Sequence, residues 1–275
     1  MALNRKLFRS SYRKPIGFPA IDMQRAPRGI VNLLLNNSPI FGDSFRQLNA
    51  TNTFTALVST DRGLAFDGSN SVAAASFVPT IQGPNVWSME ALLYCPAAVT
   101  HGGILDMADG SVGSATTDHG ILGRSSGDIC GYLFDGVSRV LNFGLTPDAK
   151  TFAHCIVTCD GTTFKSYGYG LHLGVITYTT QTLTVSNGGA STYTTPILVQ
   201  GESVDRDSGT QSSNVQILHG IFSNTAWTAQ EVIGRIMDPY GFLVWPDDDM
   251  MAEMLSAPAV ISPPLIASGY AETSW

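Results

Sequence analysis

Long apolar runs are missing from this 275-residue chain, and so are repeats. No stretch reaches the ~20 consecutive apolar residues that span a bilayer, so we expect no membrane segment. No apolar region follows the basic N-terminus, so a secretory signal is not expected. The absence of a fixed internal period disfavours propellers and solenoids.

Charged side chains are also scarce, at 13% of the residues against a hydrophobic fraction of 44%. The hydrophobic fraction argues against global disorder and permits a substantial core in one large β domain or two small domains. Low charge with many Gly, Ser, Thr and Asn residues suits a sandwich that hides its faces or assembles with copies of itself.

Cysteine is rare, and no C-x-x-C motif accompanies the scattered histidines. Cys155 and Cys159 lie four residues apart in a predicted strand, so they face the same side but are too far apart to pair. We predict buried thiols in a reducing compartment and no zinc site. The four cysteines are Cys95, Cys130, Cys155 and Cys159.

The best-defined segment spans residues 214–245, where a predicted strand precedes the one well-specified helix. Thr228 and Glu231 have the spacing of a capping box, and Trp227 and Val232 that of a hydrophobic staple. We expect this helix to close a β domain over an open sheet end. Its predicted apolar stripe is Val232, Ile233, Ile236 and Met237, and its predicted stop is Asp238-Pro239.

About a dozen short strands are predicted elsewhere, separated by turn signals. Asp-Gly steps tolerate the positive φ of hairpin turns, so we expect hairpins across Asp135-Gly136 and Asp160-Gly161. In the central strand at 85–95, odd positions form an apolar face and even positions a mixed one. This pattern predicts an all-β, two-sheet antiparallel sandwich with one short helix near the C-terminal end.

The first thirty residues carry seven basic side chains against Asp22, a net charge of +6, so the remainder carries −13. Three prolines keep this segment extended, and apolar residues alternate with its charges. We divide the chain into a basic extended arm (1–29), a sandwich domain (30–246) and a Pro-rich extended tail (247–275). The arm predicts docking on an acidic protein surface such as a neighbouring copy, in preference to nucleic acid.

Four sequence blocks, in this order, resemble the laminin-G-like, concanavalin-A-like jelly rolls. They are GLAFDGSNSVAAA, WSMEALLYC, HCIVTCDGTTFKSYGYG and the run from ILVQGESVDRDSG to VQILHGIFSNTAWTAQEV. The basic opening, IVNLLLNN and DPYGFLVWP are similar to the form of this domain in tailed-phage virion proteins. The resemblance covers about residues 29–245.

The resemblance implies a jelly-roll sandwich with a role in binding or assembly. We expect a non-enzymatic structural protein of a phage particle, a capsid decoration or fibre-type protein held by its arm, located in the virion and assembled in the host cytoplasm. Its expected partners are viral structural proteins and copies of itself, with no membrane. The alternatives are a carbohydrate-binding module for host surface glycans and a glycan hydrolase. An aromatic groove on the concave sheet would favour the first alternative, and two facing carboxylates there the second.

Two patterns raise the question of catalysis. Phe41-Gly42-Asp43-Ser44 resembles the nucleophile block of GDSL-type hydrolases, but the late D-x-x-H that would supply the base is absent, as is G-x-S-x-G. Glu90 is the one acid in a strongly apolar strand, and we interpret it as a salt-bridged structural residue. We therefore assign no catalytic residue.

Two groups of carboxylates suggest Ca²⁺ ligands, because hard cations favour oxygen donors. The first is Asp205-Arg206-Asp207-Ser208-Gly209, and the second combines Asp106, Asp109 and Asp118 on what we take to be another loop. Neither has full EF-hand spacing, so solvated turns are the favoured interpretation. We assign no metal ligand and no cofactor, with Ca²⁺ as the one cation considered.

Overall fold

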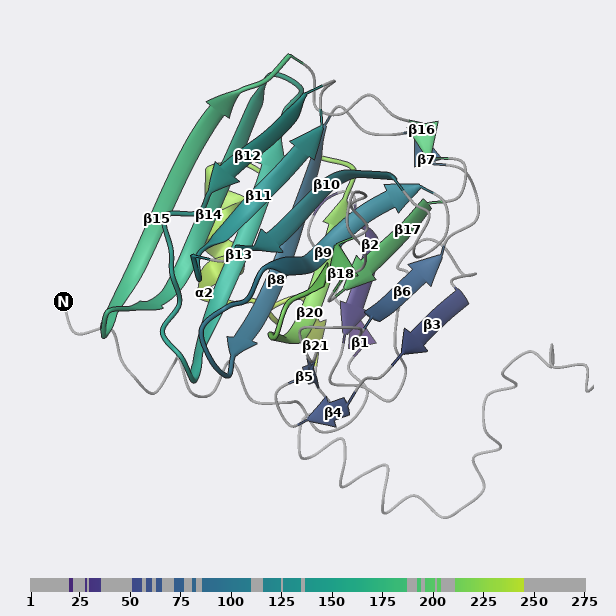
Figure 1. Cartoon of the computed structure of the whole chain (residues 1–275). Coiled ribbons are helices and arrows are strands. Elements are labelled where there is room, and N and C mark those ends of the chain that lie inside the picture. The colour runs from purple at the N-terminus through teal and green to yellow at the C-terminus, as the bar shows by residue number, and fades with distance from the viewer. Residues whose placement is uncertain are drawn as a thin grey trace, which may run out of the picture.

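The described part of the chain forms two facing β-sheets and one short helix in a computed structural model (Figure 1). The structure describes residues 86–109, 116–124, 126–134, 137–186 and 211–244, together with Arg28 and the short strands named below. The predicted antiparallel sandwich with its helix near the C-terminal end is confirmed. One bridge, Ser212 to Gly103, is parallel.

One sheet is eight-stranded and contains the longest strands. Its order is β15 (Val175–Thr184), β14 (Thr163–His172), β13 (Thr151–Cys159), β8 (Trp87–Cys95), β20 (Gln216–Ser223), β5 (Gly63–Ala65) and β4 (Val58–Thr60), and β2 (Ile30–Leu35) also pairs with β20. Both long neighbours of β8 run antiparallel to it.

The second sheet is nine-stranded and lies in front of the first in Figure 1. Its order is β12 (Ser138–Asn142), β11 (Ile129–Phe134), β10 (Thr116–Gly123), β9 (Gly102–Asp109), β17 (Pro196–Gln200), β6 (Val72–Ser76) and β3 (Thr51–Thr55), with β18 (Glu202–Ser203) and β19 (Gln211–Ser212) beside β9. Two small ladders pair β1 (Ala20–Ile21) with β21 (Leu243–Val244) and β7 (Ile81–Gln82) with β16 (Thr192–Tyr193).

The main core lies between the two sheets. Trp87, Met89 and Leu93, at odd positions of β8, pack there against residues of the other sheet such as Ile104 and Ile121. The expected odd apolar face of this strand is therefore confirmed. The hairpins across Asp135-Gly136 and Asp160-Gly161 are also confirmed, as β11–β12 and β13–β14.

Helix α2 (Ala229–Met237) lies on the other side of the eight-stranded sheet and makes a third layer, visible behind β13 and β14 in Figure 1. A second core cluster fills the space beneath it and includes Leu92, Ile156, Ile221 and Trp227. Both faces of β8 are consequently buried. The expectation that the helix covers an open sheet end is wrong, because the outer face of the sheet carries apolar side chains such as Leu92, Ile156 and Ile221 that need a cover.

The start and stop of α2 agree with the predictions. Thr228 and Glu231 form the capping box, and Asp238 ends the helix. The predicted stripe is partly wrong: Ile233 and Met237 are exposed, whereas Arg235 is buried beside Val232 and Ile236. A buried ion pair, described below, turns the helix so that Arg235 faces the sheet.

Among the described residues, no helix has the length and apolarity that a membrane span requires.

Candidate functional site

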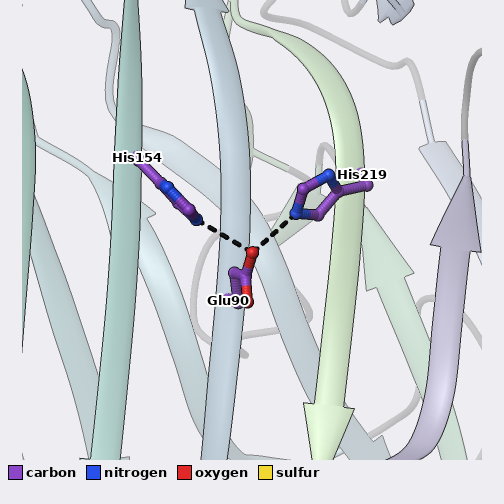
Figure 2. Close-up of side chains that lie close together, drawn as sticks. All are labelled: Glu90, His154 and His219. Atoms are coloured by element: carbon purple, nitrogen blue, oxygen red, sulfur yellow. Dashed lines mark hydrogen bonds and ion pairs between the residues drawn. The ribbon is translucent and has the colours of Figure 1, made fainter. Parts of the chain in front are cut away.

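Glu90 is completely buried at the centre of a polar cluster under α2 (Figure 2). His154 Nε2 donates to its Oε1 at 2.9 Å, and His219 Nε2 donates to the same oxygen at 2.7 Å. Arg235 donates from Nε to Oε2 at 2.8 Å and from Nη2 to Oε1 at 2.7 Å. The carboxylate thus accepts two hydrogen bonds from the arginine, one on each oxygen, and one from each of the two imidazoles.

Strand register brings the two histidines together. His154 on β13 and His219 on β20 are both the partners of Leu92, so they flank β8 one row from Glu90 on the same outer face. The helix supplies Arg235 from its last turn. The guanidinium also donates to the Pro239 carbonyl and lies 4.6 Å from the centre of the Phe242 ring.

The charges of Glu90 and Arg235 balance each other at the centre of the cluster. Burial acts to raise the pKa of Glu90, but Arg235, His154 and His219 together outweigh it and hold that pKa well below 4.5. Burial lowers the pKa of His219 to about 4, despite the opposing effect of Glu90. At neutral pH Glu90 is therefore ionised against Arg235, while His219 is uncharged and donates through Nε2.

Glu90, His154 and His219 each offer a metal-ligand atom, and these atoms lie within 4.8 Å of one another. Two carboxylate–arginine hydrogen bonds, however, already use both oxygens of Glu90. A divalent ion added to this balanced cluster would leave an excess of positive charge in a fully buried place. The donor set fits a metal poorly, and the arrangement fits an ion pair that fastens α2 to the sheet.

The predicted salt bridge of Glu90 is confirmed. Its partners were missed from the sequence, where the histidines look scattered. One local signal was available: Arg235 lies three residues after Val232 and next to Ile236, on the apolar side of the helix. A charged residue in that position requires a buried counter-charge.

The carboxylates considered for Ca²⁺ divide into two cases. Asp106 is fully buried in β9, Asp109 ends that strand and Asp118 lies in β10, so their assignment to a loop is wrong. The Asp106 carboxylate occupies the space above Gly120, where a Cβ atom would meet its Oδ1 at 2.0 Å. The segments 41–44 and 205–209 lie outside the described residues.

All four cysteines are buried thiols, as predicted. Burial raises the pKa of Cys95 to about 12 and the pKa of Cys130 to about 12, with Asp128 and Asp106 opposing Arg124 at the second thiol. Thiols in such surroundings are poor nucleophiles, because the thiolate is the reactive form.

An accessible surface adjoins the buried cluster, where the outer face of the eight-stranded sheet extends beyond α2. We call it the threonine–tyrosine face: Tyr169, Leu171, Ile176, Tyr178, Thr180 and Thr182. Register aligns Tyr169 with Tyr178 and Leu171 with Ile176 across β14 and β15. Tyr178 is 44% exposed, and Thr180 and Thr182 are also exposed. Lys165, the partner of Thr182, is the neighbouring charge.

A pocket of about 340 Å³ lies on the outer side of the other sheet. It is lined by His101, Leu122, Gly123, Arg124, Cys130, Val140 and Asn142. Two of its polar groups contact Asp128: Asn142 donates to that carboxylate, and Arg124 Nη1 lies 3.6 Å from it. These polar groups of the pocket therefore already satisfy one another.

No family model matches the sequence, and no curated protein matches it significantly. Solved structures do resemble the fold. The binding domain of botulinum neurotoxin serotype D has a TM-score of 0.53 at 10% identity, over 77% of this chain and 52% of that one. Trypanosoma rangeli sialidase with 2,3-difluorosialic acid has a TM-score of 0.51 at 12% identity, over 86% of this chain and 39% of that one. Tailspike protein 2 of Escherichia coli O157:H7 bacteriophage CAB120 has a TM-score of 0.48 at 15% identity, over 77% of this chain and 31% of that one.

The first two similarities show the fold alone, and the chain spans about two fifths to half of those two structures. These two support the β-sandwich that the sequence resemblance implies, whereas its laminin-G-like and tailed-phage form stays a prediction. The expectation that the chain is not an enzyme is overturned, because sialidases are among the structures that share this fold. The sandwich therefore gives no ground for excluding catalysis.

Proposed function

We propose that this protein binds a neutral glycan on the threonine–tyrosine face. The observation that supports this most directly is the 44% exposure of Tyr178, directly across from Tyr169 on an uncharged stretch of sheet. The exposed Tyr178 ring, with the half-buried Tyr169 and several hydroxyl groups beside it, forms a polar, aromatic surface at the margin of the core beneath the helix.

The chemistry of the face matches that of a sugar. A pyranose ring presents C–H groups that stack on an aromatic ring, and hydroxyls at its edge that exchange hydrogen bonds with threonine and tyrosine. Burial raises the pKa of Tyr169 and the pKa of Tyr178, so both phenols stay protonated and can donate. Among the described residues, no carboxylate belongs to the face and Lys165 is the cation paired with it in the sheet, which favours a neutral ligand over a charged one.

Binding to an array of immobilised oligosaccharides, followed by calorimetry with the best ligand, tests the proposal. Tyr178→Ala should weaken binding about tenfold or more, because the exposed ring supplies a stacking surface. Phe134→Ala is the matched control, since Phe134 is 38% exposed on the outside of the other sheet. An array without binding, or equal affinity for Tyr178→Ala and the unchanged protein, would refute the proposal.

A second candidate function is a structural role in a phage particle, as a capsid decoration or fibre-type protein whose partners are other virion proteins. Its support is the sequence resemblance, together with the way that the end of the basic arm is attached. Arg28 forms an ion pair with Glu231 and accepts hydrogen bonds through its carbonyl from Thr225 and Trp227. An arm fixed at this point could extend from the body toward a neighbouring protein.

Purified phage particles test that role directly. The protein should copurify with intact particles at a constant stoichiometry, and a protein without residues 1–27 should fail to incorporate. Its absence from washed particles would refute the virion role and leave the glycan proposal untouched.

A further inference from the structure

Strand β15 forms an outer edge of the eight-stranded sheet, at the left of Figure 1. It pairs with β14 over ten consecutive residues without a bulge. Its sequence, VITYTTQTLT, contains no charged residue and no proline, and most of its side chains are exposed. The strand therefore presents a long, regular and uncharged edge.

The turn before β15 decides which backbone groups point away from the sheet. His172 and Val175 flank the two residues Leu173 and Gly174, whose φ angles are 50° and 75°. Positive φ at both positions is the mark of a type I′ hairpin turn, in which the flanking residues form a hydrogen-bonded pair. Hydrogen-bonded and non-hydrogen-bonded pairs then alternate, so the even-numbered residues of β15 direct their N–H and C=O groups outward. They are Ile176, Tyr178, Thr180, Thr182 and Thr184.

Natural sheets protect such edges with lysine, proline, bulges or short strands, because an open edge pairs with other strands. The edge at β12 follows this rule: it has five residues and carries Arg139. Strand β15 has none of these protections. Among the described strands only β14 pairs with β15, and an open edge of this length indicates that it is used for pairing.

We propose that β15 pairs antiparallel with β15 of a second copy, about a two-fold axis at Thr180. This register matches every outward-directed residue with another one: Thr180 with Thr180, Tyr178 with Thr182 and Ile176 with Thr184 of the other copy. Each matched pair can exchange two backbone hydrogen bonds, which gives up to about ten bonds along the joint.

Side-chain chemistry favours a second copy of this chain as the partner that pairs with the β15 edge. An uncharged strand meets its own copy without like-charge repulsion, although the whole chain carries a net charge of −7. Across the joint, β-branched and aromatic side chains oppose each other, which are the pairs that stabilise sheets. The edge is self-complementary, and pairing joins two eight-stranded sheets into one with two threonine–tyrosine faces on the same side.

Sedimentation of the full chain over a range of concentrations tests the association. Thr180→Pro removes a backbone N–H that points away from the sheet. An edge strand tolerates proline at such a position. It should raise the dimer dissociation constant about tenfold or more, whereas Thr180→Val keeps the N–H and should leave it unchanged. A monomer at all concentrations, or a dimer that Thr180→Pro does not weaken, would overturn the proposal.

Disulfide trapping tests the register without a proline in the strand. Thr180→Cys should form an intermolecular disulfide, because its two copies lie about 5.5 Å apart between Cα atoms. Thr184→Cys is the matched control on the same exposed face, and its two copies lie about 27 Å apart in this register. Efficient trapping of Thr180→Cys alone supports the proposal. Equal trapping of both, or of neither, contradicts it.

Discussion

Glu90 is an ionised carboxylate inside a strand whose every side chain is buried. It stays charged because Arg235 reaches it from the helix and His154 and His219 from the neighbouring strands. Buried pairs of this kind add little net stability compared with apolar residues, but breaking one leaves an uncompensated charge. We therefore expect the cluster mainly to set where α2 docks on the sheet.

Removal of Arg235 should lower the free energy of unfolding more in the presence of Glu90 than when Glu90 is neutralised as well. We expect Arg235→Met to lower the free energy of unfolding by about 3–5 kcal/mol, because Glu90 would lose its counter-ion in a buried site. In the double variant with Glu90→Gln the loss should be clearly smaller than the sum of the single losses. Urea unfolding of the four proteins measures this coupling, and additive losses would mean that the two side chains act independently.

Acid should destabilise the protein through the same cluster. The folded-state pKa of His219 is lowered to about 4, so the unfolded chain binds the proton first as pH falls below about 6.5. Stability is therefore lost between about pH 6.5 and 4, by up to about 3 kcal/mol at about 1.4 kcal/mol per pKa unit. The depressed pKa of Glu90 adds a loss at still lower pH.

Urea unfolding at pH 7, 6 and 5 measures this dependence. His219→Gln keeps an N–H donor for Glu90 but removes the titrating ring, so its stability should change less between pH 7 and 5. His101→Gln is the control, since His101 is exposed. Identical pH profiles for His219→Gln and the unchanged protein would contradict the assignment.

The cysteines should be reduced and unreactive in the folded protein. A thiol reagent added without reductant should count four thiols after denaturation and react only slowly before it, because all four are buried. A count below four in the denatured protein would mean that some are oxidised.

At the scale of elements, α2 depends on its first turn. Trp227 is 3% exposed, donates from its backbone N–H to Ser88 Oγ at 2.9 Å and from Nε1 to the Arg28 carbonyl at 3.1 Å. The Arg28 side chain lowers the pKa of Glu231 to about 2, with the capping contacts of Thr228 acting in the same direction and burial opposing them. The cap, the staple and the end of the basic arm thus meet at one place.

Truncation of Trp227 should therefore weaken the attachment of the helix. We expect Trp227→Ala to cost about 3–5 kcal/mol, as large-to-small changes in a core do. Ile233→Ala, at a 49% exposed position of the same helix, should change stability by less than about 0.5 kcal/mol. A melting temperature that Trp227→Ala leaves unchanged would show that the staple contributes nothing.

At the scale of the whole molecule, the arm should be needed for assembly and not for folding. The described residues of both core clusters lie between 87 and 242, so a chain without residues 1–27 should stay folded. Deletion of residues 1–29 also removes the contacts of Arg28. We expect its melting temperature to lie below that of the chain without residues 1–27, by about 2–4 °C for each kcal/mol of stability lost.

Calorimetry of the two truncated forms, together with binding to purified particles at low and high salt, measures both effects. Loss of particle binding with β15-mediated dimers intact would separate the two kinds of association. Full binding by the truncated forms would refute the role of the arm.

Local chemistry in the sequence was enough to predict several elements. Thr228 and Glu231 mark the helix start because capping is a contact between near neighbours, and Asp-Gly steps mark two hairpins because φ preferences are local. The hairpin at Leu173-Gly174 escaped prediction, because a leucine with positive φ breaks the usual residue preference.

The sequence by itself thus determined the alternating strands, the capped helix α2, the apolar odd face of β8 and the burial of the thiols. Tertiary structure alone decided that α2 covers the outer face of the eight-stranded sheet, that Arg235 faces inward in place of Ile233, and that Glu90 meets His154 and His219 from strands 64 and 129 residues away. The physical reason is range: capping, turns and side-chain alternation act between near neighbours, whereas strand register and charge pairing across layers depend on how distant segments pack.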